Sequence, residues 1–204
     1  MRRTTLWKPM LLFAAVAVLG LAFTGCAKRP EMEIAAARTA VTEATTPDAQ
    51  TYAPDALRKL REAEQALDRE LGVQDKKFAL FRKYEVAKTL TADVEAKAQE
   101  VKSTAAAKKA EAMAEATRLL DEAKALLVEV QTMIEKAPRG KGTALDLQVM
   151  KSDLASVETT IAEADMSFAS EKYLEAQKQA KLAINTATTV KNELTAAMEA
   201  KKRR

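Results

Sequence analysis

Two stretches of equal length decide the fold: YEVAKTLTADVEAKAQEVKSTA at residues 84–105 and YLEAQKQAKLAINTATTVKNEL at residues 173–194. Each stretch follows a Lys and begins Tyr-x-x-Ala, and small or apolar residues then recur at alternating steps of three and four. This spacing places the recurring residues on one stripe of an α-helix. The chain therefore contains an internal repeat built on helices with a narrow, Ala-rich seam. The seam residues are Tyr84, Ala87, Thr91, Val94, Ala98, Val101 and Ala105, and Tyr173, Ala176, Ala180, Ala183, Ala187, Val190 and Leu194.

The composition favours long helices and excludes several classes of enzyme. Roughly one residue in five is Ala, and Lys, Glu and Leu supply much of the rest, which is typical of long helices and coiled coils. Only 4% of the residues are aromatic, so a large conventional core is not expected. The chain has no His and one Cys, which excludes Ser-His-Asp and Cys-His catalysis, disulfides and most zinc sites. Gly140-Lys141-Gly142-Thr143 lacks the upstream Gly of a phosphate-binding loop and is interpreted as a basic turn. We therefore expect no enzyme, no catalytic residue, no metal site and no bound cofactor.

Gly and Pro divide the chain into expected helices at 31–45, 54–71, 73–137, 143 to about 165, and from about 168 almost to the C-terminus. The segment 45–53 is expected to be a polar linker, and Gly72 is expected to end the second helix. The third helix, with neither Gly nor Pro, would be about 60 residues and about 90 Å long. Its apolar stripe is expected to resume at Met113, after an Ala-Lys-rich stretch at 103–112. That stretch is either a helical waist between two bundles or a kink or break.

The repeat predicts an all-α fold: an elongated antiparallel helical bundle or coiled coil. It consists of two tandem three-helix units, 31–110 and 111–204, that share one long continuous helix. For Tyr84 and Tyr173 two interpretations remain. Either the rings anchor the cores at the turn ends, or one hydroxyl faces a partner, which makes these two residues the candidate partner contacts. Ala-rich seams can also pair between chains, so a homo-oligomer is compatible with the sequence.

The first 25 residues are predicted to be a lipoprotein signal peptide, followed by a tether at 26–30. Basic residues precede the apolar run Met10–Phe23, which is too short for a comfortable membrane span but has the length of a signal-peptide core. Phe23-Thr24-Gly25-Cys26 resembles the lipobox of bacterial lipoproteins, although Leu usually stands where Phe23 does. The resemblance implies cleavage before Cys26 and lipidation of that residue. The alternatives are an ordinary cleaved signal peptide or an N-terminal membrane anchor, with an incidental Cys.

The lipobox resemblance also bears on localisation in the cell envelope. Two or more acyl chains hold a protein firmly on a membrane. Residue 27 is Ala, whereas the enterobacterial pattern for inner-membrane retention has Asp at that position. The resemblance therefore implies a lipid anchor in the outer membrane, facing the periplasm, rather than in the inner membrane.

Without residues 1–25 the chain carries 30 basic and 29 acidic residues, which argues against a nucleic-acid partner. The charges are unevenly placed, because the chain ends in the basic tail Lys201–Arg204. This tail either complements the end of a helix or contacts anionic lipid or cell-wall carboxylates.

A second resemblance rests on Tyr52-Ala53-Pro54-x-x-Leu57, on Leu60, Ala63 and Leu67, and on Tyr84-x-x-Ala87. These residues resemble a domain-of-unknown-function family of Ala-rich, all-helical bacterial envelope lipoproteins, over residues 31–110 and more weakly over the second repeat. In that family the domain also occurs fused to peptidoglycan-binding domains of the outer-membrane-protein-A type. The resemblance implies no biochemical activity. The chain is also similar to the murein lipoprotein, but it ends in Arg203-Arg204 rather than in the Lys that attaches that protein to the wall.

These observations predict a membrane-anchored periplasmic lipoprotein that acts as a structural or interaction module, a scaffold or spacer of the cell envelope. Its expected partners are the membrane, through the lipid anchor, and an envelope protein or peptidoglycan. The alternative is a lipid- or amphiphile-handling lipoprotein whose amphipathic helices open to shield acyl chains. The narrow, Ala-rich stripes favour the first interpretation.

Overall fold

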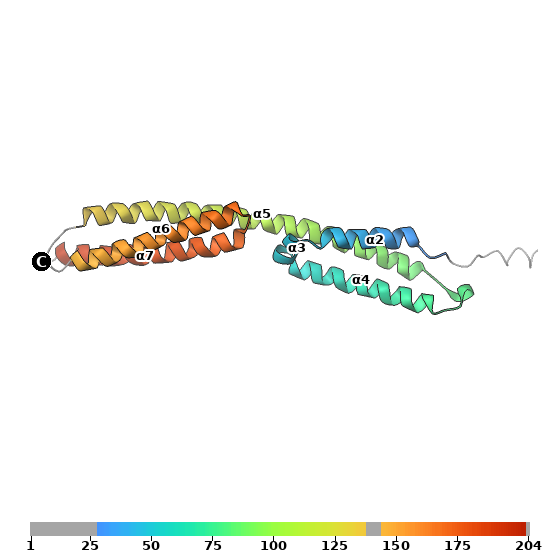
Figure 1. The fold of residues 1–204 in the computed structure, drawn as a ribbon. Helices are drawn as coiled ribbons and strands as arrows, with labels where there is room; N and C mark the ends of the chain where they lie inside the picture. The colour runs from blue at the N-terminus through green and yellow to red at the C-terminus, as the bar shows by residue number, and fades with distance from the viewer. Residues whose placement is uncertain (1–27, 138–143, 203–204) are drawn as a thin grey trace, which may run out of the picture. The chain divides into compact units, whose positions relative to one another are not determined.

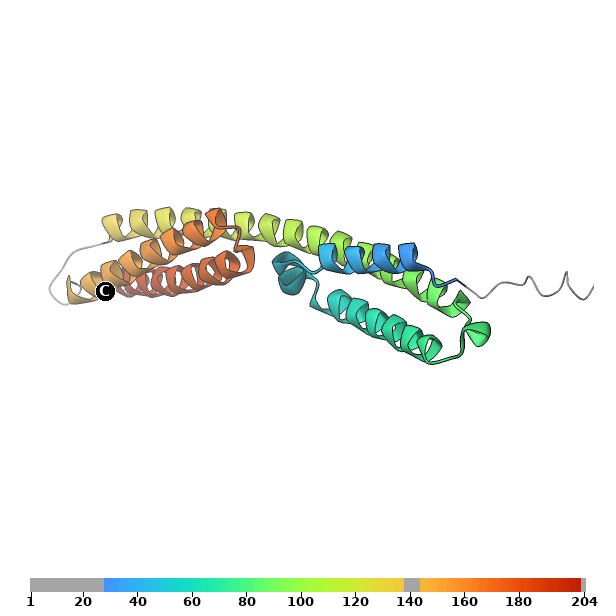
Figure 2. The same ribbon diagram turned by 45° about the vertical axis from the view of Figure 1, so that its right-hand side comes forward.

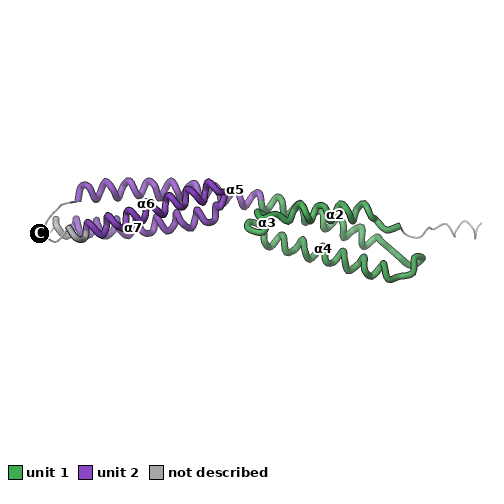
Figure 3. Tube along the Cα trace, viewed as in Figure 1, with its two compact units in different colours: residues 1–105 green, residues 106–204 purple. Residues whose placement is uncertain are grey.

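The computed structural model describes residues 28–137 and 144–202, and within these ranges it is all-α, as predicted, with no β-strand. The chain divides into two compact units, one up to Ala105 and one from Ala106 onward (Figure 3). The long helix α5 supplies its first part to unit 1 and the rest to unit 2. The elements are α2 (Glu31–Ala44), α3 (Pro47–Tyr52), α4 (Pro54–Asp75), the 3₁₀ turn η1 (Ala79–Phe81), α5 (Glu85–Lys136), α6 (Ala144–Ala169) and α7 (Tyr173–Lys202) (Figure 1).

Unit 1 packs α2, α4 and the first part of α5 around one core, with α3 closing one end (Figure 2). The Leu residues of α4 face the Ala and Val seam of α5, and the absence of bulk at Ala lets the helices approach closely. Ion pairs join the helices at the surface: Lys102 Nζ lies 2.6 Å from Glu43 Oε2, and Arg38 Nη2 lies 3.3 Å from Asp68 Oδ1. The buried core residues are Ile34, Ala37, Ala44, Ala49, Ala53, Leu57, Leu60, Ala63, Leu67, Leu71, Tyr84, Ala87, Val94, Ala98, Val101 and Ala105.

Unit 2 packs the rest of α5 against the α6–α7 hairpin. Seven residues on α7 keep the predicted seam, and all of them are buried. On α5 the prediction is off by one residue at the start of this unit, because Ala112 is buried and Met113 is exposed. The buried core residues include Leu119, Leu120, Ala123, Val130, Ile134, Ala137, Met150, Leu154, Val157, Ile161, Ala164, Ala180, Ala183, Ala187, Val190 and Leu194.

The prediction of a single helix over 73–137 is wrong at its N-terminal end. Helix α4 continues through Gly72 to Asp75, and α5 begins only at Glu85. Gly72 is tolerated within the helix at a cost of about 1 kcal/mol relative to Ala. The break falls instead in residues 76–84, which contain no Gly or Pro. The chain reverses there because both stripes, on α4 and on α5, must face the same core.

Two smaller corrections concern local turn chemistry. The predicted linker 45–53 contains the short helix α3, whose N-cap Thr46 accepts a hydrogen bond from the amide of Ala49 at 3.1 Å. Pro47 suits the first turn of this helix. The turn expected near 165–167 lies later, because α6 runs to Ala169.

Residues 103–112 are helical throughout, so the alternative of a break in this stretch is wrong. Helix α5 is therefore the continuous helix that the repeat predicted. The expected loop at 138–142 lies outside the described residues.

Candidate functional site

The candidate lipidation site, Cys26, and the predicted signal peptide lie outside the described residues, so both remain predictions. The described chain begins two residues later, and Arg29 reaches the end of α4. Its Nη1 lies 3.5 Å from Asp75 Oδ2, and its Nε lies 3.5 Å from Glu31 Oε1. The start of α2 and the connection between α4 and α5 consequently lie at the same end of unit 1 (Figures 1 and 2).

The connection between α4 and α5, residues 76–84 and hereafter the 76–84 loop, presents large apolar side chains to solvent. Phe78, Leu80 and Phe81 are each 69% exposed. The two Phe rings are 6.5 Å apart and inclined by 52°, so they cover one another only in part. Burying a side chain of this size stabilises a fold by about 1.5–3 kcal/mol. Unit 1 gains little of that stabilisation from these three residues.

Cations flank this apolar run on both sides. Lys76 and Lys77 precede it, Arg82 and Lys83 follow it, and residues 76–84 contain no carboxylate. Arg82 also closes the loop, because its Nε donates to the carbonyl oxygen of Lys77 at 3.0 Å and its Nη2 donates to that of Asp75 at 3.1 Å. The loop thus combines exposed apolar residues with cationic residues before and after them in the sequence.

The side chain of Gln74, near the end of α4, holds the 76–84 loop through hydrogen bonds. The sequence did not predict this role. The Gln74 side chain is 5% exposed, and its Nε2 donates to Glu70 Oε1 at 2.7 Å. Its Oε1 accepts from the backbone amide of Lys83 at 3.0 Å and from Lys77 Nζ at 3.2 Å. A signal was present, since Gln74 follows Leu71 by three residues on the Leu stripe of α4. A polar residue at a core position usually carries a specific hydrogen-bond network.

Tyr84 and Tyr173 are both buried and lie in the cores of different units. Tyr84 is 2% exposed, and its hydroxyl lies 3.5 Å from Asp75 Oδ1. Tyr173 is 8% exposed, and its ring stands edge-on to Phe168 with centroids 5.2 Å apart and an interplanar angle of 63°. Their positions favour the interpretation as core anchors over that as partner contacts.

The exposed faces of the helices carry ion pairs at helical spacing. Arg118 bridges Glu115 and Glu122 at 2.9 and 2.8 Å, and hydrogen bonding to Arg118 lowers the pKa of the Glu115 carboxyl. In unit 1 the hydrogen bond from Lys102 likewise lowers the pKa of Glu43. These are solvated pairs of the kind that contribute little to stability. Within the described residues, His, Cys, Asp and Glu side chains do not gather in groups of three or more that could hold a metal ion.

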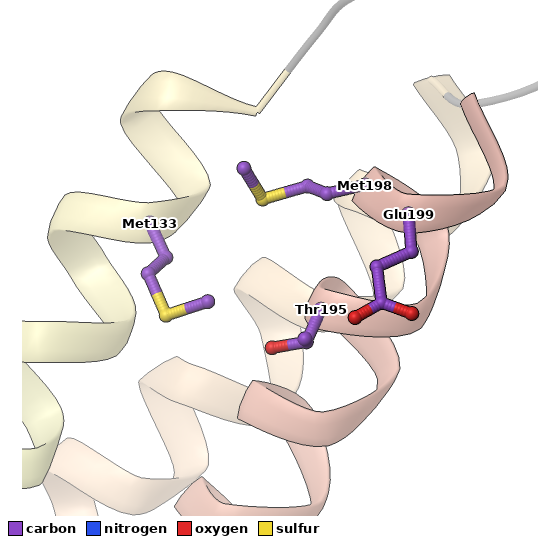
Figure 4. A pocket seen from close by; sticks show the side chains of 4 residues that line it. All are labelled: Met133, Thr195, Met198 and Glu199. Atoms are coloured by element: carbon purple, nitrogen blue, oxygen red, sulfur yellow. The ribbon is translucent and has the colours of Figure 1, made fainter. Parts of the chain in front are cut away.

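A recess of about 300 Å³ lies in unit 2 between α5 and α7. Figure 4 shows its lining: Met133 from α5, and Thr195, Met198 and Glu199 from α7. Two thioethers, one hydroxyl and one carboxylate suit a small apolar group better than they suit acid–base catalysis. The volume is at the lower end of the range of ligand pockets.

The helices in the described part of the chain are not long and apolar enough to cross a membrane. No known protein family, curated protein or solved structure matches the chain. Any proposal about function therefore rests on the residues and their geometry.

Proposed function

We propose that this chain is a lipid-anchored structural or interaction protein of the bacterial cell envelope, acylated at Cys26 and facing the periplasm. The observation that carries the proposal is the position of its only Cys, three residues after the apolar run ends at Phe23 and five residues before α2 begins at Glu31. An acyl anchor at Cys26 would hold unit 1 close to the membrane surface. The outer membrane is the proposed location, because residue 27 is Ala.

The two bundles support an interaction role. Their cores use Ala and Val seams that let helices pack closely, and their outer faces carry solvated ion pairs. Such units provide long helical surfaces for an envelope protein or for peptidoglycan. The proposal needs no catalytic group.

Amphiphile handling is the second candidate function, and the recess lined by Met133 and Met198 is the observation that favours it. Uptake of a fluorescent fatty acid by the folded chain would support it. Uptake that is unchanged in Met133→Ala and Met198→Ala variants would argue against this recess as its site.

The anchor is tested by growing a bacterial host that expresses the chain with an alkyne-tagged fatty acid. We expect label on the wild-type protein and none on Cys26→Ser. Equal labelling of both would contradict the proposal. Unlabelled wild-type protein that is processed normally would indicate an ordinary signal peptide.

The interaction role is tested by co-sedimentation with purified cell-wall sacculi at physiological salt, using chains that begin at residue 26. Saturable binding that survives removal of Lys201–Arg204 would identify peptidoglycan as a partner. Absence of binding, or binding that depends on the basic tail, would exclude a specific wall contact. The partner would then be sought by crosslinking the lipidated protein in intact cells.

A further inference from the structure

We infer that the 76–84 loop is a membrane-contact element, which inserts Phe78 and Phe81 into the interfacial region of an anionic phospholipid bilayer. The lipid-binding chemistry belongs to the loop itself. The orientation of the loop toward the same bilayer as Cys26 rests on the lipid anchor proposed above.

The first argument is the arrangement of the apolar side chains. Phe78, Leu80 and Phe81 are adjacent and strongly exposed, whereas scattered exposed apolar residues are ordinary on protein surfaces. The bonds from Gln74 and Arg82 hold the backbone on either side of them. Phe and Leu side chains gain by entering the boundary between headgroups and acyl chains of a bilayer, and a loop already held in place orders little further on binding.

The second argument is the charge around this apolar centre. Lys76 and Lys77 stand on one side, and Arg82 and Lys83 stand on the other. Cations next to an inserted apolar segment lie at the depth of the phosphate groups, where an anionic leaflet attracts them. A groove on a partner protein would bind the Phe side chains without requiring positive charge on both sides, so the charge pattern favours a lipid surface.

The third argument is the distance from the proposed anchor. Three peptide bonds link Cys26 to Arg29, so their Cα atoms are at most about 11 Å apart. Arg29 contacts Asp75, the residue that precedes the loop. Acyl chains on Cys26 would therefore keep the loop within reach of the bilayer at a high effective concentration.

The decisive experiment uses a Trp as a depth reporter. The only Trp in the chain is Trp7, in the predicted signal peptide, so the chain from residue 26 has none. The described core runs from Ile34 to Leu194 and is retained in that chain. Phe81→Trp places a fluorophore in the loop. Met166→Trp, at a 64% exposed position on α6, is the matched control.

Both Trp variants are made in the acylated chain and reconstituted into vesicles of phosphatidylethanolamine and phosphatidylglycerol. We expect a blue-shifted emission of the Trp at position 81 and its quenching by brominated lipids, with neither effect at position 166. If the Trp at position 81 is neither shifted nor quenched, the inference is wrong, whatever else the anchor does.

The same chain with Cys26→Ser separates the loop from the anchor. We expect the non-acylated chain to bind phosphatidylglycerol-containing vesicles more tightly than vesicles of phosphatidylcholine. Replacing both Phe78 and Phe81 by Ser should weaken that binding about tenfold or more. Because both side chains are exposed, circular dichroism should show an unchanged helix content and melting temperature.

Lys76→Glu with Lys83→Glu, two exposed positions whose side chains do not bond to Gln74, should also weaken binding and reduce its dependence on salt. Vesicle binding that is unchanged in the Ser and Glu variants would overturn the inference. Binding by the Cys26→Ser chain combined with absent fatty-acid labelling of the wild type would uphold the loop and remove the proposed anchor. Fatty-acid labelling of the wild type, combined with an unshifted and unquenched Trp at position 81, would uphold the anchor and overturn the inference about the loop.

Discussion

In each unit the chain reverses between a helix with a stripe of large apolar residues (α4 or α6) and a helix with an Ala-rich seam (α5 or α7). The two units form this reversal differently. In unit 2 the reversal between α6 and α7 takes only residues 170–172. Glu171 adopts a left-handed conformation with φ of 58°, and the amides of Glu171 and Lys172 bond to the carbonyl oxygens of Phe168 and Ser167 at 3.0 and 2.9 Å. This is the Schellman arrangement of a helix end. Phe168 stays on α6 and packs on Tyr173.

In unit 1 the same reversal takes residues 76–84, and two Phe side chains face solvent. Reversal of two packed helices does not require that length, since unit 2 does it in three residues. The longer loop therefore adds exposed apolar surface that its own bundle does not bury. This difference favours a binding role for the 76–84 loop of unit 1.

The largest expected effect tests whether the two Tyr residues are equivalent anchors. Tyr84→Ala and Tyr173→Ala should each destabilise their unit by about 3 kcal/mol or more, because each leaves a cavity where a buried ring packed. Chemical denaturation followed by circular dichroism measures this. A loss below about 1 kcal/mol at either position would contradict the role of that ring as an anchor.

Gln74→Ala should have the next largest effect, about 1–3 kcal/mol, because it leaves the part-buried backbone amide of Lys83 without its side-chain acceptor. Hydrogen exchange should accelerate in residues 75–84. Gln177→Ala is the matched control, since Gln177 Nε2 donates to the carbonyl oxygen of Ala112 at 2.8 Å within unit 2. Equal exchange in the loop of both variants would show that Gln74 does not hold it.

Glu171→Gly should stabilise unit 2, because a non-Gly residue in the left-handed region costs about 1–2 kcal/mol. The gain is reduced by loss of the pair between Glu171 Oε2 and Lys109 Nζ, 2.6 Å apart, which is worth about 0–1 kcal/mol. Glu171→Ala loses the pair and keeps the strained backbone, so it should destabilise. Comparing the two melting temperatures isolates the backbone contribution, and identical values would contradict it.

The smallest effect concerns pH and the exposed pairs. The pKa of Glu43 is lowered from its ordinary value of 4.5 by the hydrogen bond from Lys102. The unfolded chain therefore binds the proton first, and the contribution of the pair is present above the ordinary pKa and is lost as the pH falls through the lowered one. Glu43→Gln should remove a slight part of the acid sensitivity of unit 1. Denaturation midpoints at neutral and acidic pH measure it, and an unaltered pH dependence would contradict it.

Much of the fold was predictable because residues on one face of a helix recur at steps of three and four in the sequence. The α7 seam and the Leu stripe of α4 are buried as predicted, and α5 is continuous through residues 103–112. The α4–α5 break was not predictable from Gly and Pro. Residues 76–84 contain neither, and Gly72 stands inside a helix where a side chain would meet open space. Gln74 was missed because a polar residue on an apolar stripe shows its role only through its partners.

The sequence by itself determined that the chain is all-α and repeated, and it marks Cys26 as the candidate anchor, because seam spacing and the place of a lone Cys are local properties. Tertiary structure alone decided where α4 ends, that both Tyr rings are buried, and that Phe78 and Phe81 are strongly exposed whereas Phe168 is half-buried against Tyr173. These outcomes depend on which surfaces the packed helices cover. The same residue type is therefore exposed to different extents at the two reversals.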